Sequence, residues 1–499
     1  MQPALSPSEA WQPLPANEWN SNHARHLLRR TGWTARPAET DRAIAEGLNA
    51  TLDRLFPEQP TLLPKPRMVA RLEEEAAALA EKLRTTVGDA RRTLDRQTRE
   101  RSQLAIQDLT IKWLQAAARP ENAAFAKWVL FLSDVYVVSL EKVRNAAFIH
   151  EHFDILARNA LGGAPELTKA VSRSTAMVLY LDLNQNQRKA PNENFARELF
   201  ELFVLGEGNY TEGDIKEAAK AFTGYRTRAN EPGFRYVESQ HDPGPKTLFG
   251  ETGNFTGDDV IDLAYRQKAA GRFLPHEMVK FYLSDEALPE EYLATLGQEW
   301  RNEGYSLRTL VRRFFGSRLF FAPEFRGNFI KSPVQFYLGL VQDLNLDIAP
   351  LPRFTINPMR QMGQLLYTPP NVRGWLGGRS WINSATLSAR RQLVETLFTP
   401  IDERALNADE LIELVAARTN GLQNFTVGEQ HPLASLAKLD PAEAAARLTS
   451  DFIAVSVARD FTASVQQFIS APTPDPRQRS RRVRRAAVAV LQSPEYQLC

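Results

Sequence analysis

The stretch PNENFARELFELFVLGEGNYTEGDIKEAAKAFTGYR, residues 191–226, carries the clearest fold signal in the chain. Asn192 or Asn194 can cap a helix start, because its side-chain carbonyl accepts an unpaired backbone N–H. Gly206 and Gly208 then end this helix, since glycine adopts a left-handed conformation at little cost. Between these limits, four apolar side chains form one stripe at helical spacing: Phe195, Leu199, Leu202 and Phe203.

The second half of the same stretch predicts another helix. Thr211 opens it, and Asp214 three residues later resembles a capping box with Asp in place of the usual Glu. The helix runs to Phe222, and Gly224 stops it. The two halves together predict a helix–turn–helix pair.

The polar face of the first helix supports two interpretations. Its side chains follow the spacing i, i+3, i+4, i+7: Asn194, Arg197, Glu198 and Glu201. One interpretation is a solvated face with an Arg–Glu pair. The other is a buried polar cluster in which Glu198, Glu201 and Glu217 bind a metal or move protons, as carboxylates from two helices do in helical bundles. No E-x-x-H pair is present within this stretch, so the di-iron signature is missing from it.

Length and composition describe an ordinary globular chain with a large core. Of its 499 residues, 43% are hydrophobic and 24% are charged, and the net charge is +2. This balance gives no global reason to expect nucleic acid as a partner. The single cysteine, Cys499, excludes an intrachain disulfide and a multi-cysteine zinc site. No apolar run is long enough to span a bilayer.

The periodicity predicts a mainly α fold: a large multi-helix assembly with a small β-hairpin and ordered Gly/Pro loops. Residues 1–66 are expected to form a lead-in and helices, and 67–120 a long charged helix or hairpin. Residues 121–499 are expected to form a helical core on which 1–66 packs. The strongly apolar run 124–140 fits a buried helix better than a strand, and Asp134 within it then needs a partner.

A loop rich in Gly and Pro follows the central stretch, with sequence QHDPGPKTLFGETGNFTGDD. His241, Asp242 and Lys246 place three different functional groups on this stiffened loop, which is where chemistry tends to occur. The alternative is that Asp242 closes a turn and Lys246 is solvated.

A second informative zone is QLLYTPPNVRGWLGGRSWINSATLSAR, residues 364–390. Its Pro and Gly pairs make a rigid loop around Asn371 that carries Trp375 and Trp381. Two tryptophans in such a loop line a ligand pocket or cover one side of a core. Asn383 or Ser384 then caps the helix that follows.

These segments, with HLLRRTGW, IKSPVQF and the terminal LQSPEYQ, resemble the DUF1800 family of bacterial proteins. The motifs fall in the expected order and cover nearly the whole chain. The resemblance implies a mostly helical architecture and a DUF1501 family protein as partner; the activity of the family is undefined. The first residues lack a basic start and an apolar run, which favours a cytoplasmic protein, whereas the resemblance implies a periplasmic or exported one.

The chain departs from the family pattern at one place. Many relatives resemble W-H-N-H-F where this chain has the residues Leu132 to Tyr136, LSDVY. If the two histidines bind a metal in relatives, this chain has lost both ligands at Ser133 and Val135.

The first function hypothesis is an enzyme whose pocket joins the central helix pair and the two loops. Its acid or base is His241, with Asp242 and Glu198 as further catalytic residues. Glu198 and Glu201 are the candidate ligands of a divalent metal. Arg197 and Lys246 hold an anionic group, and the other binding candidates are Asn371, Trp375, Trp381 and Asn383.

The second hypothesis is a non-catalytic helical scaffold that binds a partner protein, with the charged segment 67–120 as its contact surface. Nucleic acid is an unlikely partner, because the arginine-rich run 477–485 has no interleaved aromatic residues. The serine-hydrolase elbow, the P-loop and the dinucleotide fingerprint are all absent from the sequence.

Overall fold

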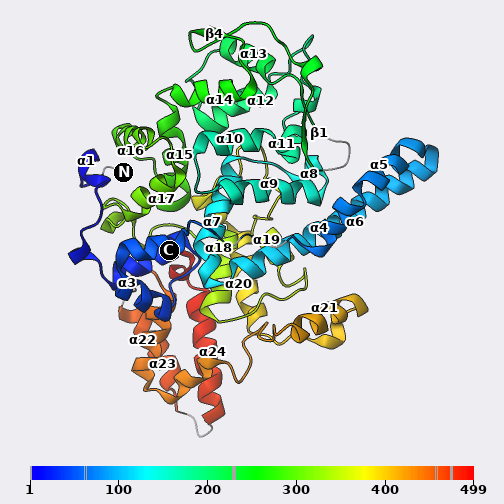
Figure 1. The fold of residues 1–499 in the computed structure, drawn as a ribbon. Coiled ribbons are helices and arrows are strands. Elements are labelled where there is room, and N and C mark those ends of the chain that lie inside the picture. The colour runs from blue at the N-terminus through cyan, green and yellow to red at the C-terminus, as the bar shows by residue number, and fades with distance from the viewer. Residues whose placement is uncertain are drawn as a thin grey trace.

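The structure, a computed structural model, describes residues 3–60, 62, 65–227, 232–455, 457, 459–472 and 476–499. Helices dominate it, and the only strands among these residues form two small antiparallel pairs (Figure 1). The predicted mainly α fold with a little β structure is confirmed. One continuous apolar core contains buried side chains from Ala10 to Tyr496.

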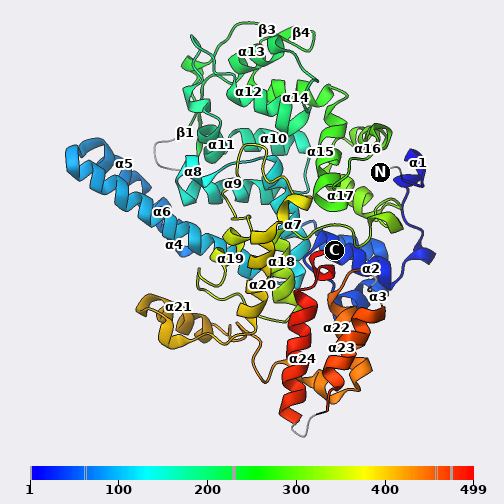
Figure 2. The same ribbon diagram turned by 180° about the vertical axis from the view of Figure 1, so that it is seen from behind.

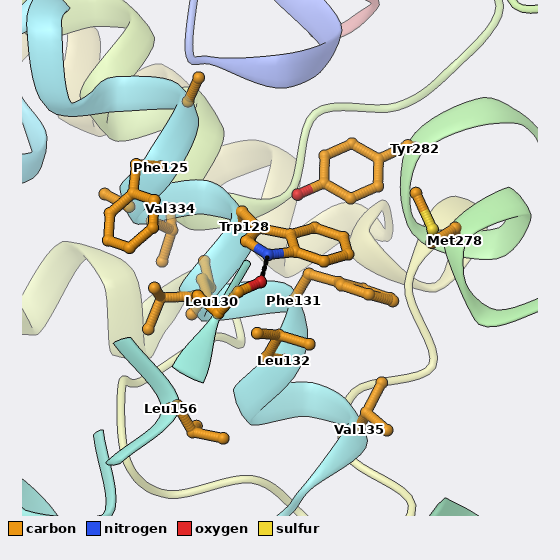
Figure 3. Close-up of a cluster of buried hydrophobic side chains, with 14 of the residues drawn as sticks. Phe125, Trp128, Leu130, Phe131, Leu132, Val135, Leu156, Met278, Tyr282 and Val334 are labelled. Atoms are coloured by element: carbon orange, nitrogen blue, oxygen red, sulfur yellow. Dashed lines mark hydrogen bonds between the residues drawn. The ribbon is translucent and has the colours of Figure 1, made fainter. Parts of the chain in front are cut away.

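Helix α7 (Pro120–Val135) runs through the middle of this core. It is buried nearly all round, which is why its sequence is apolar on every face. Figure 3 shows Trp128 and Phe131 at its centre, stacked with ring centroids 5.0 Å apart. The indole N–H of Trp128 donates to the carbonyl of Ala160 over 2.7 Å. The helix predicted within the apolar run 124–140 is therefore present, and it ends before Tyr136.

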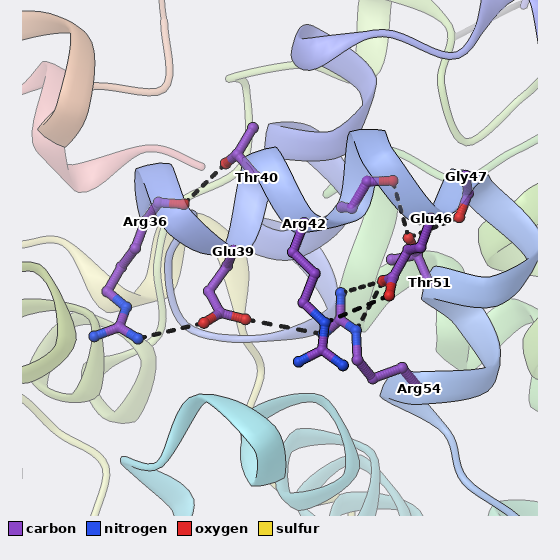
Figure 4. A network of polar contacts seen from close by, with 9 residues as sticks. Arg36, Glu39, Thr40, Arg42, Glu46, Gly47, Thr51 and Arg54 are labelled. Carbon is purple, nitrogen blue, oxygen red and sulfur yellow. Dashed lines mark hydrogen bonds and ion pairs between the residues drawn. The ribbon is translucent and has the colours of Figure 1, made fainter.

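The N-terminal residues form helices α1 (Pro7–Ala10), α2 (Ser21–Thr31) and α3 (Pro37–Leu55). Helix α3 kinks at Gly47, whose φ of 79° favours glycine. Arg54, beyond the kink, reaches back to Glu46 and Glu39 before it. These ion pairs tie the two halves of α3 together (Figure 4).

The charged segment folds into a hairpin that projects from the body (Figures 1 and 2). Helices α4 (Arg67–Glu74) and α5 (Ala76–Thr85) form one limb, and α6 (Gly88–Ala117) forms the other. The base of the hairpin packs on α7 and α9, where Leu109, Trp113 and Leu114 are buried. We call residues 67–104 the arm.

The middle of the chain contains short helices around the central helix pair. In chain order its helices are α8 (Leu140–Val143), α9 (Ala146–Asn159), α10 (Ala164–Ser172), α11 (Thr175–Tyr180), α12 (Asn194–Glu198), the π-helix η3 (Leu199–Val204), α13 (Glu212–Ala221), α14 (Gly257–Arg266), α15 (Ala270–Met278), the π-helix η5 (Val279–Leu283), α16 (Glu290–Asn302) and α17 (Leu307–Gly316). The strand pairs are β1 (Tyr225–Thr227) with β2 (Phe234–Tyr236), and β3 (Lys246–Leu248) with β4 (Glu251–Gly253).

The C-terminal part adds α18 (Pro333–Asp343), α19 (Ile356–Gln361), α20 (Ser384–Leu397), α21 (Ala408–Thr419), α22 (Pro441–Phe452), α23 (Arg459–Ser470) and α24 (Pro476–Leu491). Helix α24 contains the arginine-rich run. Three of its guanidinium groups donate to backbone carbonyls of neighbouring segments: those of Arg479, Arg482 and Arg484. These arginines therefore stabilise the packing of α24 against the neighbouring segments. None of the described helices combines the length and the apolar character needed to cross a membrane.

Buried cations hold several helix ends together at the centre. The Lys127 ammonium on α7 donates to the carbonyls of Arg30 (2.8 Å) and Gly32 (3.1 Å), where α2 ends, and to Oε1 of Gln335 on α18 (3.0 Å). Arg30 in turn donates to backbone carbonyls of Tyr282 and Phe325. Complete burial lowers the pKa of Lys127 to about 7. The three acceptors compensate for the loss of water around its charge.

Candidate functional site

The second helix of the central pair is capped as predicted, but the first is not: its N-cap is Glu193, with no side-chain cap bond, in place of Asn192 or Asn194. The Thr211–Asp214 capping box is present, and the Asn192 side chain accepts the backbone N–H of Asn194. The first helix, however, is α-helical only over α12 and continues as the π-helix η3. The Leu205 N–H accordingly bonds the carbonyl five residues earlier, at Phe200. Such segments are rare and frequently occur at functional sites.

The polar face of this helix is half-buried, and most of its charges are paired. Arg197 bonds Glu193 on its own helix and Glu212 at the start of α13. Glu201 accepts from the Tyr210 hydroxyl (3.0 Å). Glu198 has no hydrogen-bond partner among the described residues; burial, followed by the charge of Glu201, raises its pKa.

The predicted metal ligands Glu198 and Glu201 lie close enough for the charge of Glu201 to contribute to the raised pKa of Glu198. Within the described residues, however, no group of three or more His, Cys, Asp or Glu side chains is arranged to hold a metal ion. The pair therefore has no third protein ligand of these types.

The loop carrying His241, Asp242 and Lys246 closes on itself and on the end of α13. His241 Nδ1 lies 3.1 Å from the carbonyl of Thr223, whose hydroxyl accepts the Asp242 N–H. Asp242 closes a turn by accepting the Gly244 N–H, and the buried Lys246 donates to two carbonyls of the same loop. Among the described residues, no hydrogen bond or ion pair joins this loop to Glu198.

The Trp375 loop, residues 368–383, does reach the central helix pair. Its Arg373 guanidinium bonds Glu201 (2.6 Å) and Glu207 (2.6 Å). Asn371 accepts the Arg373 N–H and so shapes the turn. At the far end of the loop, Asn383 caps α20 through a reciprocal pair of bonds with Thr386.

This loop closes a cavity of about 60 Å³ against α7 and the junction of α15 with η5. The ionisable groups that line the cavity are Lys127, Asp134, Glu277, Lys280 and Arg373. Trp375 and Trp381 form the aromatic part of its wall, and the second π-helix, η5, contributes Lys280 and Phe281. Both described π-helices therefore border the Trp375 loop.

Asp134 lines this cavity and is half-buried. Its Oδ1 accepts the backbone N–H of Trp375 over 3.0 Å. No described group bonds its other oxygen. Burial raises the pKa of Asp134 to about 7, and the charge of Glu277 adds to this effect.

Glu277 has the opposite electrostatic environment. Burial opposes its ionisation, but bonds from His276 (3.1 Å) and Lys280 (2.9 Å) outweigh this cost and lower its pKa. The cavity therefore contains one carboxyl group whose pKa is raised to about 7 and one whose pKa is lowered. This difference is typical of acid–base sites.

Two glycines allow the loop to approach the body this closely. A Cβ on Gly374, where φ is 74°, would lie 2.1 Å from Oδ1 of Asp134. A Cβ on Gly378, where φ is 53°, would lie 2.2 Å from a carboxylate oxygen of Asp285. Side chains at either position would push the loop off the cavity.

The sequence analysis named Trp375 and Trp381 as binding candidates but missed the carboxyl groups of Asp134 and Glu277 as functional residues of this cavity. Asp134 gave one signal, as a carboxylate within an apolar run, but nothing in the sequence connected it with Glu277 and Trp375. The segment that departs from the family pattern, LSDVY, forms part of the cavity wall through Asp134 and Val135.

These features define a large helical protein with a small cavity of mixed charge on its central helix. The family model described as "Protein of unknown function (DUF1800)" matches residues 26–498, and the chain belongs to this family. Searches of curated proteins and of solved structures found no match.

Replacing Asp134 by Asn should change how stability depends on pH. Because the pKa of Asp134 is raised, the folded protein binds more protons than the unfolded chain between about pH 4 and about pH 7. The wild-type free energy of unfolding therefore decreases as the pH rises through this window, and Asp134→Asn lacks this contribution. Across this window, the difference in the free energy of unfolding between the wild type and Asp134→Asn should change by about 4 kcal/mol at most. Urea unfolding across the window measures it.

The control is Asp41→Asn, at an exposed aspartate on α3. This variant should follow the wild-type pH dependence. If the difference in the free energy of unfolding between Asp134→Asn and the wild type stays constant with pH, the raised pKa of Asp134 is contradicted.

Proposed function

We propose that the protein is an enzyme that hydrolyses a bond to oxygen in the α7 cavity. The observation that carries this proposal is that one small cavity contains both Asp134, whose pKa is raised to about 7, and Glu277, whose pKa is lowered. Two carboxyl groups whose pKa values are pushed apart can divide the roles of acid and base.

In this proposal Asp134 donates its proton to the leaving oxygen. Oδ1 is fixed by the Trp375 N–H, so the carboxyl group is oriented before the substrate arrives. Glu277 accepts a proton from the attacking water. Lys280 and Arg373 bind negative charge on the substrate, because both cations border the cavity.

The size of the cavity limits what enters it. A water molecule needs about 10–15 Å³ by this measure of volume, so 60 Å³ holds a reacting group of only a few heavy atoms. The rest of the substrate would lie outside, along the half-buried Trp375 and Leu376, which is 86% exposed. An exposed apolar side chain next to a tryptophan suits a substrate with an apolar or sugar-like face.

The residues predicted from sequence have supporting roles in this proposal. Glu201, through Arg373, sets the position of the Trp375 loop over the cavity. His241, Asp242 and Lys246 stabilise the loop that follows α13 and do not contact the substrate.

The test is turnover of a panel of chromogenic esters, phosphoesters and glycosides by the wild type and its variants. Asp134→Asn and Glu277→Gln should each reduce turnover by about 100-fold or more, since each removes a proton-transfer group. Wild-type activity should fall as the pH rises above about 7, where Asp134 loses its proton.

Asp41→Asn, far from the cavity in sequence and exposed, should retain wild-type turnover. The proposal is contradicted if the whole panel is left unhydrolysed by the wild type, or if Asp134→Asn turns over substrate at the wild-type rate.

We propose partner binding through the arm as a second candidate function, with a DUF1501 family protein as the partner. Two apolar side chains on the arm favour it: Val87 at the turn is 80% exposed and Leu104 is 53% exposed. Figure 2 shows the arm projecting from the rest of the protein, where a partner could contact both limbs.

If the arm binds this partner, the double variant Val87→Glu, Leu104→Glu should weaken binding by about tenfold or more, because it places charge in the contact. Co-expression and affinity measurement with the DUF1501 family protein would show this. Gln103→Glu, an exposed change of charge on the same helix, is the matched control. Equal binding by all three proteins, or none by the wild type, would rule out the arm.

A further inference from the structure

A second, larger cleft of about 570 Å³ lies between α2, the segment 323–327 and the end of α22. Its positively charged groups are Arg25 and Arg29 of α2 and Arg326 of the segment, and His26 also faces it. No aspartate or glutamate is among the described residues that line it. It shares no lining residue with the α7 cavity.

Among the described residues, no aspartate or glutamate forms an ion pair with any of the three guanidinium groups. Arg25 donates to the carbonyl of Ser450 and Arg29 to that of Asp451, each over 3.3 Å. Arg326 donates to the carbonyl of Phe321 and to Nε2 of His23. None of the three has an aspartate or glutamate carboxylate within 4 Å in the described part of the chain.

Burial makes the lack of a carboxylate in contact costly for Arg29, which is only 6% exposed. A buried charge is normally paired, because removing it from water costs several kcal/mol. Asp343 and Cys499 lie near enough to favour its charge, and Glu324 does the same for Arg326. The Asp451 carboxylate is directed to the Ser450 hydroxyl instead. The described cleft therefore places three cations around one opening with no aspartate or glutamate side chain among its lining residues, and Cys499 is the one lining residue whose charge favours that of Arg29.

We propose that this cleft binds a small phosphorylated molecule, with its phosphate held by Arg25, Arg29 and Arg326. The planar guanidinium group matches phosphate oxygens in pairs. The volume lies within the range of ligand pockets, about 300–1,000 Å³. No Phe, Tyr or Trp is among the described lining residues, so the cleft offers no surface for stacking a nucleobase.

Calorimetry on the full chain tests the proposal, with inorganic phosphate, a sugar phosphate and the same sugar without phosphate as probes. The wild type should bind the sugar phosphate saturably and the unphosphorylated sugar not at all. If inorganic phosphate binds as tightly as the sugar phosphate, the ligand is the free ion. Absence of saturable binding by both phosphate probes overturns the proposal.

Arg25→Gln is the first variant, because Arg25 is partly exposed and its loss should leave the fold intact. It should weaken binding about tenfold or more, since it removes a charge-assisted contact. Arg29→Lys keeps the buried charge but loses the paired geometry, so it should weaken binding as well.

Arg391→Gln, at an exposed arginine on α20, should bind like the wild type. Equal affinity in Arg25→Gln and the wild type overturns the proposed site. So does equal weakening in Arg25→Gln and Arg391→Gln, which would indicate attraction by net charge alone.

Discussion

Helix α7 carries two ionisable groups of opposite sign, the buried Lys127 and the half-buried Asp134, and much of the structure depends on how each is accommodated. Lys127 and Asp134 are seven residues apart, so they lie on the same face two turns apart. A charge in an apolar core must be satisfied by hydrogen bonds or lose its proton. The molecule combines both for Lys127, which has three oxygen acceptors and a pKa lowered to about 7. It uses the second for Asp134, which has one bond and a raised pKa.

The different hydrogen bonding of Lys127 and Asp134 has different structural consequences. The acceptors of Lys127 are at the end of α2 and on α18, so the ammonium group joins three helices that are distant in sequence. Asp134 instead holds one backbone N–H of a loop and keeps an oxygen for the cavity. The lysine contributes to the architecture, whereas the aspartate leaves hydrogen-bonding capacity available for a ligand.

The sequence was sufficient to predict the helical architecture because the signals are local. Helical periodicity, the Thr211–Asp214 capping box and the terminating glycines depend on residues within one or two turns of each other. The π-helices could not be predicted in this way, since segments of 6 and 5 residues are too short for a sequence pattern to distinguish a π period from an α period. The cavity depends on contacts between residues 134, 277 and 375, which no spacing rule connects. The prediction that His241 and Glu198 share a pocket relied on the same kind of long-range contact, and no bond joins them among the described residues.

The protonation state of Asp134 is the property on which the account of the cavity rests. It can be measured directly from the side-chain carboxyl ¹³C shift of Asp134 as a function of pH, assigned by difference from the Asp134→Asn protein. The account predicts a single titration with a midpoint near 7, because burial and Glu277 both oppose ionisation. A midpoint near 4, the value of an ordinary solvated aspartate, would contradict it.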